Sequence, residues 1–134
     1  MIENQENLVD LGDKVVGQIE LPSIDISPYV GKMVKVADVK EYEGNYGYYI
    51  RITTETVATL DQKDKEGNPI VLKASRMFGL QTDAEGQIGW GEKTLLGNFL
   101  KKKKVAHYKD LIGKEVVTTS VTNKDDGKDY LSFN

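Results

Sequence analysis

The sequence predicts a mainly β domain of five strands, with one helix between the third and fourth strands and an extended segment before the first. Residues 32–60 and 70–80 are rich in β-branched and aromatic side chains and are interrupted by glycine-containing or polar turns. Residues 94–105 carry apolar side chains at helical spacing, and residues 114–133 return to strand-forming residues. A chain of 134 residues is long enough for one domain with its own apolar core.

The N-terminal residues divide into two segments. Residues 1–14 hold few apolar side chains and are predicted to form a flexible acidic arm. Residues 15–31 alternate apolar and polar side chains but contain Pro22 and Pro28, which is typical of an extended segment along a sheet edge. We therefore expect an arm at 1–14 and a single domain at 15–134.

The first three strands are predicted from dense runs of β formers. The first begins at Lys32 and ends at a turn over residues 43–47, which makes a hairpin with a long second strand at 48–60. A polar loop at 61–69 then leads to a third strand at 70–80.

The second half of the chain is predicted to hold the helix and the last two strands. Leu95, Leu96, Phe99 and Leu100 fall on one helical stripe, and the run Lys101–Lys104 closes the helix where cations favour its dipole. Gly97 weakens this helix without forbidding it. Strands at 114–122 and 129–133 are joined by a turn over 123–128.

This order of elements resembles an OB-fold, a five-stranded Greek-key barrel whose helix lies between strands three and four. The resemblance covers residues 29–134, and its local marks are the strand openings Gly31-Lys32-Met33-Val34 and Gly113-Lys114-Glu115-Val116. An SH3-like barrel uses similar strands but has no place for a full helix after the third. The chain is similar in architecture to single-stranded DNA-binding proteins, which implies binding of DNA or RNA across strands two and three, as in DNA replication.

The charge distribution is compatible with such a ligand. The net charge of the chain is −3, but residues 1–29 hold six carboxylates against one lysine, which leaves residues 30–134 with a net charge of +2. A local positive groove is therefore permitted, because binding depends on where charges lie more than on their total.

Aromatic and basic residues of the predicted hairpin are the main functional signal. Tyr42, Tyr46, Tyr48 and Tyr49 crowd around its turn. If Ile50 and Ile52 point into the barrel, period two sends Tyr49 and Arg51 to the outer face, an aromatic ring beside a cation. The alternative is that these tyrosines only cover the mouth of the barrel, because Tyr is also a good strand former.

Three further residues complete the predicted nucleic-acid-binding set. Lys73 is expected on the outer face of the third strand, whereas Arg76 is expected inward near a rim, contacting either ligand or an internal carboxylate. Trp90, between glycines, is either a lid packed on the core or an exposed stacking platform. The predicted set is therefore Tyr46, Tyr49, Arg51, Lys73, Arg76 and Trp90.

The sequence holds few of the residue types and motifs that catalysis requires. The chain has no cysteine, a single histidine (His107) and no glycine-lysine phosphate loop, so we predict a non-catalytic protein with no metal site and no cofactor. The alternative to nucleic-acid binding is a protein-interaction or assembly module, including a homo-oligomer, that uses the same Tyr-rich face. Without a signal peptide or an apolar span the expected compartment is the cytoplasm, with no membrane partner.

Overall fold

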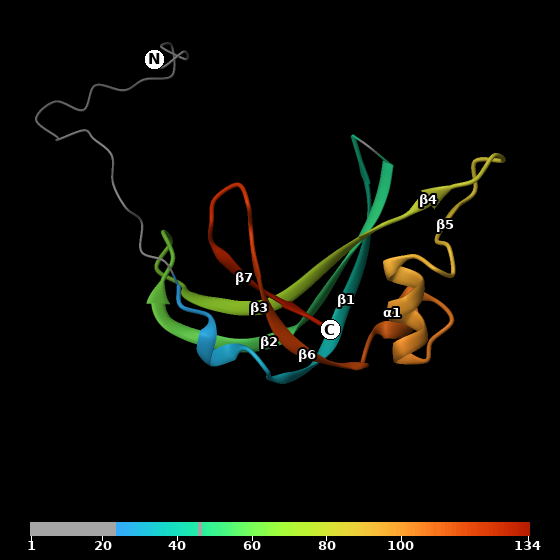
Figure 1. Cartoon of the computed structure of the whole chain (residues 1–134). Coiled ribbons are helices and arrows are strands. Elements are labelled where there is room, and N and C mark those ends of the chain that lie inside the picture. The colour runs from blue at the N-terminus through green and yellow to red at the C-terminus, as the bar shows by residue number, and fades with distance from the viewer. Residues whose placement is uncertain (1–23, 46) are drawn as a thin grey trace, which may run out of the picture.

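The computed structural model describes residues 24–45 and 47–134, which form five main strands, a two-stranded hairpin and one α-helix (Figure 1). In chain order the elements are the 3-10 turn η2 (Ser27–Tyr29), β1 (Met33–Gly44), β2 (Gly47–Lys63), β3 (Pro69–Gly79), β4 (Gln81–Thr82), β5 (Ile88–Gly89), α1 (Leu95–Lys103), the 3-10 turn η3 (Tyr108–Leu111), β6 (Glu115–Thr122) and β7 (Asp129–Phe133). Within these residues no helix has the length and apolar character needed to cross a bilayer. The predicted mainly β class is confirmed.

The main sheet is antiparallel, with strand order β3-β2-β1-β6-β7. Its two edge strands, β3 and β7, lie against each other, so the sheet curls into a nearly closed barrel (Figure 1). β1 pairs with two strands: its residues 33–35 pair with β6, and its residues 36–44 pair with β2. A register shift between Val36 and Asp38 marks the change, because an extra residue bends a strand and lets it leave one partner for another.

Strand alternation places the core inside this barrel. The fully or nearly fully buried apolar residues of the strands are Val36, Ile50, Ile52, Ala74, Phe78, Val116, Leu131 and Phe133. α1 covers one end of the barrel, where the ring of Phe99 lies 5.4 Å from that of Phe78 and 5.9 Å from that of Phe133. Burying each such side chain contributes about 1.5–3 kcal/mol.

Residues 24–32 lie at the opposite end of the barrel (Figure 1). Ile26 is buried there, and the hydroxyl of Thr118 donates to the Tyr29 carbonyl at 2.6 Å and accepts from the Lys32 amide at 2.8 Å. The expected extended conformation is wrong at residues 27–29, which form a 3-10 turn with Pro28 inside it. Proline fixes φ near the value that such a turn needs, so it favours the turn here instead of an edge strand. The predicted arm at 1–14 and residues 15–23 lie outside the described residues.

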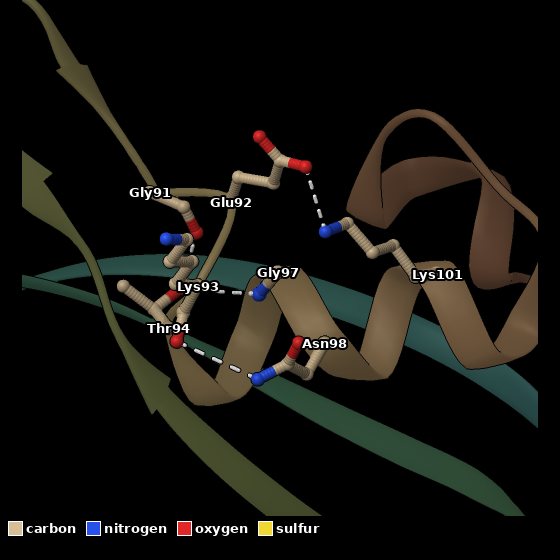
Figure 2. A network of polar contacts seen from close by, with 7 residues as sticks. All are labelled: Gly91, Glu92, Lys93, Thr94, Gly97, Asn98 and Lys101. Carbon is tan, nitrogen blue, oxygen red and sulfur yellow. Dashed lines mark hydrogen bonds and ion pairs between the residues drawn. The ribbon is translucent and has the colours of Figure 1, made fainter.

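The helix differs from its prediction in length and in one position of its stripe. It begins after Thr94, whose side chain accepts the Gly97 amide at 3.1 Å, as Figure 2 shows. Leu95, the first helical residue, is 75% exposed and does not share the buried stripe. A Cβ at Gly97 would lie 2.3 Å from the Gly91 carbonyl oxygen, so glycine lets the preceding loop pack directly on the helix.

Candidate nucleic-acid interface

The outward side chains of the second half of β1, of β2 and of β3 form one continuous surface. Ile50 and Ile52 are completely buried, so the predicted alternation on β2 is confirmed and its neighbours point outward. We call this surface the β1–β3 face; it consists of Asp38, Lys40, Tyr42, Tyr49, Arg51, Thr53, Lys73, Ser75, Met77 and Gly79.

Strand register arranges this face in rows across the three strands. Tyr42 lies opposite Tyr49, and Tyr49 lies opposite Gly79. In the next row Lys40 lies opposite Arg51, which in turn lies opposite Met77. An aromatic row therefore adjoins a cationic row about 7 Å further along the strands.

The aromatic row offers a flat surface with open space beside it. The rings of Tyr42 and Tyr49 are stacked, with centroids 5.2 Å apart and planes 16° from parallel. Nothing lies within 4 Å of where a Cβ would stand on Gly79, and a depression of about 550 Å³ opens between the hairpin, Tyr49, Met77 and Gly79. The tyrosine pair is thus held in place on one side and accessible to a planar ligand on the other.

The cations of the face differ in their partners. Lys40 lies 3.9 Å from the carboxylate of Asp38. Among the described residues, Arg51 and Lys73 are exposed and form no ion pair. These two cations therefore remain available to a negatively charged ligand.

Lys73 also lines a groove at the seam between β3 and β7, with a volume of about 660 Å³. Lys128 and Tyr130, at the end of the β6–β7 loop and the start of β7, form the other wall. Ile24 and Ile26 line it as well, so the groove lies where residues 24–26 meet the seam. Asp25 and Asp129 line the groove too, so its two lysines are offset by two carboxylates and the groove has a mixed rather than a cationic lining.

Arg76 is directed inward, as predicted, and is absent from the β1–β3 face. Its guanidinium donates to the Phe133 carbonyl at 3.2 Å and lies 4.6 Å over the ring of Phe78 and 5.3 Å over that of Phe99. Burial lowers the pKa of the guanidinium. A backbone carbonyl and two aromatic faces thus take the place of the internal carboxylate suggested by the sequence, because β7 brings its last carbonyl to this rim.

The three hairpin tyrosines that the structure describes do not form one cluster. Tyr42 and Tyr49 share the β1–β3 face, whereas Tyr48 pairs with Glu43 on the opposite side of the hairpin. There Tyr48 lines a separate depression of about 340 Å³ together with Glu41 and Tyr108. Tyr46 lies outside the described residues.

Trp90 belongs to this opposite side and packs there, which favours the packing alternative. Its ring meets His107 edge-on at 5.2 Å and Tyr108 at 5.4 Å. The Tyr108 hydroxyl donates to the carboxylate of Glu41, which lowers the pKa of Glu41. Desolvation first and this carboxylate second raise the pKa of Tyr108 to about 12. His107 caps η3, because its Nδ1 accepts the Lys109 amide at 3.1 Å.

The lysine run lies in the last turn and C-cap of α1, as predicted, at the barrel end that α1 covers. Figure 2 shows Lys101 paired with Glu92 at 2.8 Å. Lys103 donates to the Glu115 carbonyl at 3.0 Å and lies 5.7 Å over the ring of Phe99. These contacts hold two of the four lysines on the body of the protein.

The predicted binding set lacks Lys40, Lys128 and Tyr130. It also lacks Tyr42, which the sequence placed near the hairpin turn without assigning it to a face, and Met77, which alternation directs outward on the third strand. Extending the period-two alternation through the hairpin register to β1 finds Lys40 and Tyr42. Lys128 and Tyr130 depend on the approach of β7 to β3, for which no local pattern exists.

A scan against protein-family models, a search of curated proteins and a search of solved structures find no match to this chain. Function must therefore be inferred from the geometry of the described residues.

Proposed function

We propose that this protein is a non-catalytic module that binds single-stranded nucleic acid on its β1–β3 face, with the cytoplasm as its compartment. The observation that carries the proposal is the accessible Tyr42–Tyr49 stack beside Gly79, adjoining a row that contains Arg51. Aromatic planes for bases and cations for phosphates are the two requirements of single-strand binding.

An OB-type Greek-key barrel is the architecture that we propose for the sheet. The strand order β3-β2-β1-β6-β7, the contact of β3 with β7 and the position of α1 between β3 and β6 in the chain support it. In such a barrel, ligands cross strands two and three between two flanking loops. The β1–β2 turn and the β6–β7 loop are the corresponding loops here.

Each part of the face has a role in this proposal. One base stacks on Tyr49 above the gap left by Gly79, which contributes about 1–3 kcal/mol. Arg51 and Lys73 meet phosphates by charge. The ten residues of the β1–β3 face include no Asn or Gln, the side chains that read adenine edges, and Asn45 is the one such residue that lines the adjoining depression within the described part of the chain. We therefore propose little sequence preference. The proposed ligand is DNA ahead of RNA.

The test is fluorescence anisotropy of the full chain with a labelled 30-mer, titrated at several salt concentrations with DNA and with RNA. We expect saturable binding that weakens as salt rises, because bound phosphates release counterions. Absence of binding to both oligonucleotides at low salt would contradict the proposal.

A protein-interaction module is the second candidate, and one observation favours it. Met77 is exposed on β3 opposite Arg51, and Met, Tyr and Arg are enriched at protein interfaces. Such a contact would depend weakly on salt, so the same titration separates the two functions.

A further inference from the structure

The outer surface of the barrel carries a second feature, on β6 and the first half of β1. Val34 and Val116 point into the barrel, so their neighbours Met33 and Val117 point outward, and these two lie opposite each other across the strands. Met33 is 67% exposed and Val117 is 41% exposed. Val121, two positions of alternation further along β6, is 52% exposed. We call Met33, Val117, Thr119 and Val121 the β6 stripe.

This stripe does not belong to the β1–β3 face. The register shift between Val36 and Asp38 divides β1, and only the part beyond it contributes to that face. Apolar residues that adjoin on a surface mark an interaction site more often than single exposed ones do. The stripe is therefore a candidate for a separate contact.

The residues beside the stripe indicate which partner fits it. In the row next to Met33 and Val117, Lys35 lies opposite Glu115, and both side chains are exposed. Among the described residues neither side chain forms an ion pair. The surface thus carries one positive and one negative group at the same level on two neighbouring strands.

We propose that the β6 stripe is the interface of a symmetric dimer of this chain. Consider a two-fold axis that runs parallel to the strands, between the two packed sheets and midway between β1 and β6. It places β1 of one copy over β6 of the other, and each row of residues stays at the same height along the axis. Lys35 then faces Glu115 of the second copy, Met33 faces Val117, and each contact occurs twice. Two sheets packed in this way lie about 10 Å apart, the ordinary spacing of stacked sheets.

The dimer is independent of the proposed nucleic-acid binding, but it adds to it. The two β1–β3 faces stay outside the interface, so one dimer presents two binding surfaces. An oligonucleotide long enough to reach both surfaces would bind more tightly than a short one, because its second contact becomes intramolecular.

The first test is sedimentation velocity of the full chain at about 100 µM, above the dissociation constants usual for interfaces of ordinary size. We expect a dimer. Val117→Glu should raise its dissociation constant more than about 100-fold, because the charge enters the apolar contact twice. Val71→Glu is the matched control, since Val71 is 47% exposed on β3, outside the stripe, and should leave the dimer intact. Circular dichroism establishes that each variant is folded.

Charge exchange supplies a second test that does not disturb the apolar centre. Lys35→Glu alone and Glu115→Lys alone should each weaken the dimer, because both create two like-charge contacts across the axis. The double variant should restore it, because every contact is again between opposite charges. A monomeric wild-type chain, a dimer that survives Val117→Glu, or a double variant no better than the single ones would each overturn the proposal.

Discussion

Truncating Tyr49 is the sharpest test of the proposed binding face. Its ring stacks on Tyr42 and lies beside the open position at Gly79, so Tyr49→Ala removes the surface on which a base would stack. A stacking contribution of about 1–3 kcal/mol corresponds to a dissociation constant about 5- to 150-fold higher. The cost to folding is smaller, because the aromatic pair contributes about 0.5–1.5 kcal/mol and the side chain is only half-buried.

The adjacent residue provides the control for this prediction. Alternation directs the Tyr48 side chain to the opposite side of the hairpin, although the residue also borders the depression beside Gly79. Tyr48→Ala should therefore reduce oligonucleotide affinity much less than Tyr49→Ala does. Tyr49→Phe keeps the ring and should bind as the wild type does. Anisotropy titrations with a DNA 30-mer, together with thermal unfolding of each variant, measure both effects. Equal reductions in affinity for Tyr48→Ala and Tyr49→Ala, or a Phe variant as weak as the Ala variant, would refute the assignment of the face.

Three further outcomes are expected. Replacing Arg51 and Lys73 with Gln should reduce the slope of log affinity against log salt by about 0.7 for each phosphate that the variant no longer binds. Replacing Lys101–Lys104 with Gln should change this slope little. If the lysine run instead accounted for most of the slope, the binding surface would be centred on α1. Gly97→Ala should lower the free energy of unfolding in urea by about 1–3 kcal/mol, because its Cβ would lie 2.3 Å from a backbone carbonyl oxygen of the preceding loop; an unchanged midpoint would mean that the loop moves away freely. Because the pKa of Tyr108 is raised from 10.0 to about 12, its contribution to stability is present in full below pH 10 and disappears as pH rises through 12. Tyr108→Phe should therefore remove the highest-pH step from the tyrosinate absorbance, and a titration in which an earlier step disappears would contradict this.

Local periodicity explains how much of the fold could be predicted. The strands at 114–122 and 129–133 lie within one residue of β6 and β7, and the inward positions of β2 follow from alternation around Ile50. The β4–β5 hairpin was missed because each of its strands has two residues, too few to show a period. Pro28 was interpreted as the mark of an edge strand, but tertiary contacts through Thr118 hold it in a turn.

The candidate site was predictable only for residues whose orientation follows from alternation within a single strand. Tyr49, Arg51 and Lys73 face outward as alternation requires, and their places on the β1–β3 face were found from β2 and β3 alone. For Arg76 and Trp90, the sequence could not decide whether the side chain binds ligand or packs elsewhere, because their partners come from distant parts of the chain. The carbonyl bound by Arg76 comes from β7, and the rings that meet Trp90 come from the segment after α1.

The division of β1 explains how one small barrel could present two surfaces that do not interfere. Before the register shift its outward residues, Met33 and Lys35, adjoin β6; after it, Lys40 and Tyr42 adjoin β2. A strand paired with one neighbour throughout would give both groups the same surroundings, and a ligand on one would crowd the other. Because the strand changes partner, the apolar stripe and the aromatic face lie on different parts of the barrel wall. Substitutions at Val117 should therefore change assembly without changing the affinity of a short oligonucleotide, and substitutions at Tyr49 should do the reverse.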